Sequence, residues 1–415
     1  MNIKTIIGIA VPLLLASCDS SKIEDANLNN STTSSQPARL THEEFVKRGN
    51  NFSLELLEKV CRANKDQSFV TSPISVMFSM AMLQNGSVGE TRSQILHTLG
   101  YSDSDSQSLN EYCAETMKQD DISGSVSTNI ANGLFLAEPL VLNKDYKDVL
   151  TQYYKADYET LDFSNIESLQ HINAWCSEKT QGMISDVIRE LDGKLLLINT
   201  VFFKGLWANK FDPEKTALGE FYNGRSILQR PTLPFMFTQT SIKYLRSELY
   251  ETICLPFGKG LFNMYFVLPK IGETCENVIN ALNDDEWNGL DDKMKEQDVS
   301  VIIPRFRTSK HIELSGILQA MGITKAFGAK AELSSMIDGQ YSEPVCLNRV
   351  YQEAVLEIEE EGAKAAAATI TTISSDVIDG NEDKSVIFLA NRPFVYLITK
   401  GAERTIYYAG VFAGN

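Results

Sequence analysis

Few residues in this chain have a type and spacing that suit catalysis. The chain contains four histidines, His42, His97, His171 and His311, and they are widely separated in the sequence. It contains no GxSxG nucleophile motif, phosphate-binding loop, HExxH zinc motif or dinucleotide-binding glycine pattern. We therefore expect a protein that is not an enzyme, with hydrolases excluded by the missing nucleophile motifs, and that requires no cofactor and no metal ion.

The stretch with the most unusual composition is residues 359–377, which read EEEGAKAAAATITTISSDV. Its Ala, Glu and Lys residues favour a helix, whereas the Thr-Ile-Thr-Thr-Ile segment favours a strand. Strand side chains alternate between two faces. The alternating set that starts at Ala363 carries no charge, while the other set contains Lys364 and Asp376. Because the stretch also lacks proline, we predict that it can form a strand with one buried face.

The N-terminus has the pattern of an export signal. Lys4 precedes an apolar stretch from Ile6 to Ala16, which is too short to span a bilayer. The stretch ends in LASC at residues 15–18, which resembles the bacterial lipobox, whose cysteine is lipidated. We expect residues 1–17 to be a signal peptide, Cys18 to carry lipid, and residues 18–40 to be a flexible tether. An ordinary signal peptide with an incidental cysteine is the alternative.

The lipobox interpretation predicts an extracytoplasmic protein, periplasmic or on the cell surface, whose N-terminal lipid holds it to a membrane. The net charge of −16 supplies no basic face, so we expect no nucleic-acid partner. Beyond Cys18, six widely spaced cysteines remain, and the sequence assigns no disulfide among them. Most have apolar neighbours, so we expect them to be small buried residues.

The remaining pattern predicts an α+β protein with mostly antiparallel sheets and one domain over residues 41–415. Apolar residues at helical spacing predict helices over residues 43–63, 75–84, 168–179 and 312–322. Long apolar runs with β-branched residues predict strands over residues 194–207, 386–399 and 405–413, and two more around the Gly-Lys-Gly turn at 258–260.

The segment FLANRPFVYLI, residues 388–398, resembles the C-terminal signature of the serpin family, with Asn391, Arg392, Pro393 and Phe394 at its centre. Further segments resemble serpin blocks in the same order along the chain. They are SFVTSPISVMFSMAMLQNGSVGETRSQILHTLG (68–100), INAWCSEKTQGMISDVI (172–188), NTVFFKGLW (199–207), LQAMGITKAF (318–327) and YYAGVFAGN (407–415). The resemblance covers about residues 41–415. It implies a serpin fold, with three β-sheets, a helical bundle and an exposed reactive-centre loop at about residues 360–385.

The resemblance also implies a function. Serpins offer the loop to a serine or cysteine protease as bait, and cleavage forms an acyl-enzyme. The loop then inserts into the central sheet and distorts the trapped protease. We expect a monomeric inhibitor of this kind. The alternative is a serpin that inhibits nothing and serves as a binding or chaperone module. Bulky, charged or proline residues in the alternating set that starts at Ala363, which would face inward, would favour this alternative. That set contains none of them.

Individual residues match the family by motif. The hinge residues are Glu360, Gly362, Ala363, Ala365, Ala367 and Thr369, and Arg305 matches the basic partner of the hinge glutamate. Trp207 matches the tryptophan at the opening of the sheet. Ser72, Ser75 and Asn199 match a polar cluster beneath it, in which Gln352 stands where many relatives have histidine. Glutamine can preserve the hydrogen bonds but not a pH response.

The bait bond is predicted by counting from the hinge. Sixteen positions after Glu360 lies Asp376, followed by Val377. An aspartate there suits a protease with a basic primary pocket, because an unpaired buried carboxylate is costly. The alternative is a cut at a neighbouring aliphatic residue, such as Ile370, Ile373 or Val377, by an elastase-like protease.

Overall fold

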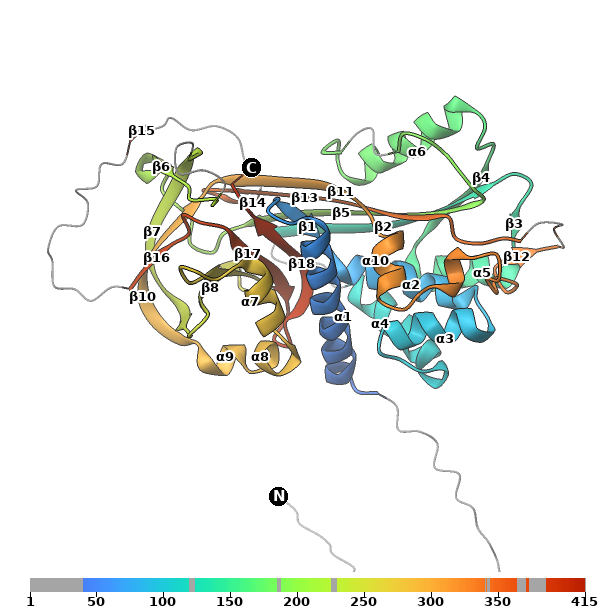
Figure 1. Cartoon of the computed structure of the whole chain (residues 1–415), viewed down its shortest axis with the longest axis horizontal. Helices are drawn as coiled ribbons and strands as arrows, with labels where there is room; N and C mark the ends of the chain where they lie inside the picture. The colour runs from blue at the N-terminus through green and yellow to red at the C-terminus, as the bar shows by residue number, and fades with distance from the viewer. Residues whose placement is uncertain are drawn as a thin grey trace, which may run out of the picture. The chain divides into compact units, whose positions relative to one another are not determined.

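The computed structural model describes residues 40–118, 124–184, 188–224, 230–339, 341, 344–363, 371–372 and 386–414 (Figure 1). Helices and sheets both contribute to the core, as expected for an α+β protein. The α-helices are α1 (His42–Ala63), α2 (Pro73–Asn85), α3 (Gly89–Thr98), α4 (Ser106–Thr116), α5 (Lys144–Val149), α6 (Ile166–Lys179), α7 (Cys275–Ala281), α8 (Asp284–Asn288), α9 (Leu290–Lys293) and α10 (Ser315–Ala320). Short 3-10 turns occur at η1 (Asp103–Asp105), η3 (Pro213–Lys215) and η4 (Lys325–Phe327), and a π-helical turn at η2 (Leu150–Tyr154).

Within the described residues, the strands form three sheets, which confirms the predicted fold class. A six-stranded sheet has the order β11 (Phe306–Glu313), β13 (Arg349–Glu359), β14 (Gly362–Ala363), β5 (Leu195–Leu206), β2 (Val126–Ala137) and β4 (Asp157–Leu161). A ten-stranded sheet contains β1 (Phe69–Thr71), β6 (Ala217–Glu220), β7 (Thr232–Arg246), β8 (Tyr250–Phe257), β9 (Phe262–Pro269), β10 (Lys295–Pro304), β15 (Thr371–Thr372), β16 (Val386–Leu389), β17 (Phe394–Lys400) and β18 (Thr405–Phe412). The third sheet pairs β3 (Val141–Leu142) with β12 (Ile337–Asp338).

Most neighbouring strands are antiparallel, as predicted. The exceptions are the pairs β13–β5, β2–β4, β10–β16 and β15–β6, which are parallel. The pair β13–β5 bears on the site described below, because a strand that lies between two parallel strands can run antiparallel to both of them.

The six-stranded sheet separates two hydrophobic cores, with α2 on one face and α6 on the other (Figure 1). Along β5, the side chains alternate between these cores. Leu197, Val201 and Phe203 belong to the larger core on the α2 side, which we call the main core. Leu196 and Ile198 belong to the smaller core on the α6 side. A strand in this sheet is therefore buried on both faces over much of its length, which explains the continuous apolar run at residues 194–207.

Helix α2 runs through the main core. Pro73 occupies its first turn, where the missing N–H needs no partner. The preceding Ser72 does not cap the helix with its side chain; its Oγ donates to the carbonyl oxygen of Tyr407 at 2.6 Å. The helix predicted over residues 75–84 thus begins at Pro73, and the serine hydroxyl before it binds the C-terminal sheet.

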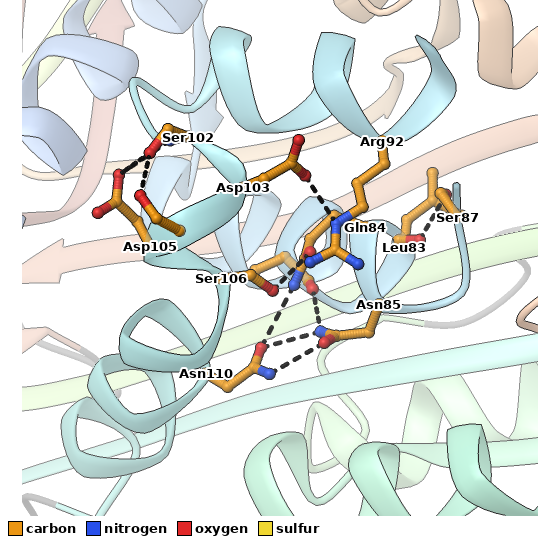
Figure 2. A network of polar contacts seen from close by, with 12 residues as sticks. Leu83, Gln84, Asn85, Ser87, Arg92, Ser102, Asp103, Asp105, Ser106 and Asn110 are labelled. Carbon is orange, nitrogen blue, oxygen red and sulfur yellow. Dashed lines mark hydrogen bonds and ion pairs between the residues drawn. The ribbon is translucent and has the colours of Figure 1, made fainter. Parts of the chain in front are cut away.

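A buried polar network fixes the C-terminal end of α2 against α4 (Figure 2). Asn110 of α4 exchanges two hydrogen bonds with Asn85, both 2.9 Å, and its Oδ1 also accepts from the hydroxyl of Tyr154. Ser106 donates to Gln84 at 2.9 Å. Because buried amides need partners, this network specifies how the two helices pack.

Two predicted elements were wrong. The helix predicted over residues 312–322 begins only at Ser315, since residues up to Glu313 continue β11 opposite β13. The strand predicted over residues 386–399 is two strands, β16 and β17, which belong to different parts of the ten-stranded sheet. Pro393, which cannot donate a backbone hydrogen bond, lies in the link between them.

The six cysteines among the described residues carry no disulfide, and Cys113, Cys176, Cys254 and Cys275 are buried as expected. Across the described part of the chain, the helices are too short or too polar to traverse a bilayer. Residues 1–39, which include the predicted signal peptide, Cys18 and most of the tether, lie outside the described residues.

Candidate functional site: the hinge at residues 359–363 and the opening of the central sheet

The strands β13 and β5 lie side by side along only part of their length. They pair directly from Arg349–Leu196 to Ala354–Val201. Beyond this point, the short strand β14 lies between them, antiparallel to both. Gly362 is opposite Glu359 and Leu206, and Ala363 is opposite Ile358 and Gly205. The chain after β13 thus turns back and enters the sheet beside the strand it has just left.

Glycine is required at the first position of β14. Gly362 has φ 151°, and a Cβ atom there would lie 2.0 Å from the carbonyl oxygen of Gly205. Such contact is not possible for a real side chain, so this hinge conformation excludes every other residue. Ala363, the next residue, is fully buried in the main core.

Glu360 anchors the turn between β13 and β14. Its carboxylate accepts hydrogen bonds from Nε of Arg305 at 3.1 Å and from Oγ1 of Thr216 at 2.7 Å, and a terminal guanidinium nitrogen of Arg305 forms a further bond. The side chain of Glu360 is buried. Burial raises the pKa of Glu360, but the hydrogen bonds from Arg305 and Thr216 outweigh it and hold the pKa below its usual value. The hinge glutamate is therefore an ionised, well-bonded anchor.

Trp207 binds the same turn through its backbone and its ring. Its indole N–H donates to the carbonyl oxygen of Glu359, and its backbone N–H donates to that of Glu361, both at 2.9 Å. The indole stacks on Phe257, with ring centroids 4.3 Å apart. The sequence identified Arg305, Glu360 and Trp207 through the family resemblance, and the structure brings all three together. The sequence contained no indication of Thr216, because this residue belongs to none of the recognised motifs.

The pairing of β14 defines a register that can be extended. An inserted strand that continues this register would place residue 365 between Leu356 and Phe203, and residue 369 between Gln352 and Asn199. The set of residues that starts at Ala363 would face the main core, because Leu356, Ile358, Val201 and Phe203 belong to it. Ala365, Ala367, Thr369, Asp376 and Val377 themselves lie outside the described residues.

A buried polar cluster lies where β13 and β5 are still joined. Gln352 and Asn199 are direct neighbours across the two strands. The amide nitrogen of Gln352 donates to the Ser75 hydroxyl and to the Ser72 carbonyl oxygen, both at 2.9 Å. Its oxygen accepts from the hydroxyl of Thr71 at 2.6 Å. Glutamine therefore acts as donor and acceptor in this cluster, and the hydrogen bonds that ionisable histidine would supply are met without a titrating group.

The cluster extends further than the sequence indicated. Asn199 donates to Asn132 of β2 at 2.9 Å, and Ser79 of α2 also donates to Asn132 at 2.9 Å. The sequence offered one sign of this extension, because Asn132 is a polar residue in the buried part of the strand at residues 126–137. A strand inserted between β13 and β5 as far as residue 369 would have to separate Gln352 from Asn199.

The signature residues hold the ten-stranded sheet together. Arg392 donates through Nε to the carbonyl oxygen of Pro269 at 2.8 Å, and the carbonyl oxygen of Asn391 accepts from the backbone N–H of Tyr222 at 2.7 Å. Phe394 is fully buried and packs on Phe266, Phe306 and Phe412. Pro393 directly precedes β17. None of these contacts involves the hinge turn.

Beside the site, a buried carboxylate lies on β13. Glu353 is 4% exposed and pairs with His311 of β11, which lies directly opposite. Burial raises the pKa of Glu353, and the bond to His311 offsets this only in part. Since the folded state favours the protonated form, ionised Glu353 lowers the stability of the folded protein at neutral pH.

We expect Glu353→Gln to raise the melting temperature by about 1 to 3 °C at pH 7.5. The gain should begin to shrink as the pH falls below the raised pKa of Glu353 and should vanish below the ordinary glutamate pKa, because the wild-type carboxyl is then protonated as well. Differential scanning calorimetry from pH 4 to 8 measures this, with the partly exposed Glu357→Gln on the same strand as control. A lower melting temperature for Glu353→Gln at every pH would contradict the prediction.

In this hinge, the segment that follows β13 turns back and forms the next strand of the same sheet. The family model for Serpin (serine protease inhibitor) matches residues 47–414. The chain therefore belongs to the serpin family.

The relatives agree with this assignment. Antithrombin-III of Mus musculus is 31% identical over 387 residues, which span 88% of this chain and 81% of the relative. Serpin-ZX of Arabidopsis thaliana is 26% identical over 388 residues, spanning 88% of this chain and 97% of the relative. The structure of Arabidopsis AtSerpin1 in its native stressed conformation superposes with a TM-score of 0.78 and 26% identity, over 90% of this chain and 98% of that one. The thermophilic serpin tengpin in its native state shares the fold, with a TM-score of 0.81 over 90% of this chain and 95% of that one.

Proposed function

We propose that this chain inhibits proteases as a suicide substrate. The observation that carries the proposal is the position of Gly362 and Ala363, which already occupy the first two places of an inserted strand. The register continues with small, uncharged residues on the face that must enter the core. The antithrombin relative belongs to the same family of protease inhibitors.

The proposed reaction begins with attack of a protease serine or cysteine on the carbonyl carbon of the bait residue. The acyl bond forms, the peptide bond breaks, and the amine of the following residue leaves. The freed loop then extends β14 between β13 and β5. About fourteen residues at about 3.3 Å each would carry the bound protease about 45 Å.

The driving force comes from the new strand. About a dozen ladder hydrogen bonds at about 1 kcal/mol each, together with burial of Ala, Thr and Ile side chains, supply on the order of 10 kcal/mol. This is comparable to the stability of a whole domain. The uncut protein is then a kinetically trapped state that keeps this free energy in reserve.

We infer that the bait bond is Asp376–Val377, which follows Glu360 by sixteen positions. The target is then an acid-specific serine or cysteine protease; cleavage at Ile370, Ile373 or Val377 would instead indicate an elastase-like one. Incubation with both kinds of protease should give an SDS-resistant complex, and mass spectrometry of the released C-terminal peptide locates the bond. Asp376→Ala should lower the rate of trapping of an acid-specific protease at least tenfold; Asp383→Ala, further along the loop, is the control.

Two results would contradict this proposal in different ways. If Asp376→Ala traps every protease as fast as the wild type, the bait assignment is wrong. If no protease forms a complex and each one merely cuts the loop, the protein is a binding or chaperone module.

We also propose that Cys18 carries lipid and that the protein lies outside the cytoplasm, held to a membrane. The support is the lipobox-like LASC sequence and the polar tether that follows it. Cys18→Ala should release the protein from the membrane fraction, or leave it unprocessed. Fractionation of cells that express both versions measures this, with Cys61→Ala as control. Equal membrane association of all three, with the signal peptide removed equally from each, would refute the anchor.

A further inference from the structure

A cavity of about 820 Å³ lies in the ten-stranded sheet region and has no part in the mechanism above. Segments far apart in the sequence enclose it, among them the end of α1, the loop that follows β6, the loop between β9 and α7, and the link between β16 and β17. Helices α1 and α7, which both contribute, lie side by side (Figure 1).

One side of the cavity is apolar. Phe69, Val411 and Ala413 line it and are buried. At the rim, Ile271 is 93% exposed and Tyr222 is 42% exposed. An isoleucine with almost its whole surface in solvent contributes nothing to the folded core, but it adds apolar surface where a ligand would enter.

The polar side of the cavity is formed by Arg392, which is half-buried. Its Nε donates to the carbonyl oxygen of Pro269, and its two terminal nitrogens have no hydrogen-bond partner within the described residues. Burial lowers the pKa of Arg392. The charge of Glu251 acts on Arg392 in the opposite direction and raises its pKa, but the carboxylate of Glu251 already forms an ion pair with Arg246 at 3.2 Å. The guanidinium thus lacks the anion that a partly buried arginine normally contacts.

The other charged groups at the cavity favour an anion. Lys65 and Lys270 line it and form no ion pair with any described residue. Of the acids, Glu276 is paired with Arg62 at 3.0 Å, and Glu273 accepts a hydrogen bond from Asn277. Among the described residues, Asp66 is the one carboxylate of the lining without such a bond. The lining has three cationic side chains, those of Lys65, Lys270 and Arg392.

We propose that this cavity binds an amphipathic carboxylate, a small molecule or chain end whose carboxylate contacts Arg392 and whose apolar part lies against the exposed surfaces of Tyr222 and Ile271. A guanidinium offers two parallel donors that match a carboxylate. The same chemistry is supplied by a fatty acid and by the C-terminus of an apolar peptide.

Isothermal titration calorimetry of the full chain at pH 7.5 tests the proposal with three probes: decanoate, decanol and N-acetyl-trileucine. Decanoate or the peptide should bind, and whichever binds more tightly identifies the source of the carboxylate. Decanol should bind at least tenfold more weakly than decanoate, because it has no charge for Arg392. Equal binding of decanol and decanoate, or no heat from either carboxylate, would overturn the proposal.

Variants locate the site. Arg392→Gln should weaken carboxylate binding about 10- to 100-fold, whereas Arg48→Gln, which removes a charge outside the cavity lining, should have no effect. Because Arg392 also supports the backbone at Pro269, a pair of rim variants provides a test that does not depend on it. Ile271→Lys should bind the carboxylate more tightly than Ile271→Glu, since both changes remove the same exposed apolar side chain without loss of packing and differ in the sign of the charge. Identical affinities for the two rim variants would place the ligand elsewhere and refute the site.

Discussion

Cutting the loop near residue 376 is expected to raise the melting temperature by about 10 to 20 °C. The cut frees the loop to extend β14, which adds on the order of 10 kcal/mol of ladder bonds and burial. A domain of this size changes its melting temperature by roughly 1 to 2 °C per kcal/mol. Calorimetry of intact protein, and of protein cut by a protease that it does not trap, measures the difference.

A cut within a segment that does not become a strand is the control. Cleavage in the tether at residues 18–40 should leave the melting temperature unchanged. If the loop-cut and intact forms melt together, the loop does not insert, and the protein is the binding or chaperone module rather than an inhibitor.

Moving one lysine by a single position should convert the inhibitor into a substrate. In the double variant Lys364→Ala/Ala365→Lys the composition and net charge are unchanged, but the ammonium group moves to the inward face. The register places residue 365 between Leu356 and Phe203, both fully or almost fully buried. An unpaired charge there costs about 3 kcal/mol, which would slow insertion about a hundredfold.

The acyl-enzyme would then be hydrolysed before it is trapped. We expect the stoichiometry of inhibition to rise at least tenfold, with cleavage of the loop at the wild-type rate. The control is Lys364→Ala alone, which removes a charge that the continued register would place on the outward face, opposite the exposed Lys204, and which should inhibit like the wild type. Equal stoichiometries for the double variant and the wild type would show that the inward set is not the one that starts at Ala363.

The alternation of charge in residues 362–377 could be found in the sequence, because strand side chains alternate whatever sheet they join. So could the order of helices and strands, since hydrophobic periodicity depends on local spacing. Periodicity failed at Ile312, which belongs to the end of β11 although the predicted helix over residues 312–322 began with it; α10 begins only at Ser315. It also failed at residues 390–393, where Asn391, Arg392 and Pro393 interrupt the apolar pattern and separate two strands of one sheet.

The sequence showed that the loop has one uncharged face, but not where that face would go. The packed structure supplies the register, because Gly362 and Ala363 pair with β13 and β5, and an inserted strand that continued this register would turn its uncharged face toward the main core. The bond from Thr216 to Glu360 and the cavity beside Arg392 likewise join residues that are distant in the chain. Contacts of this kind depend on how whole elements pack, and local residue patterns carry no information about them.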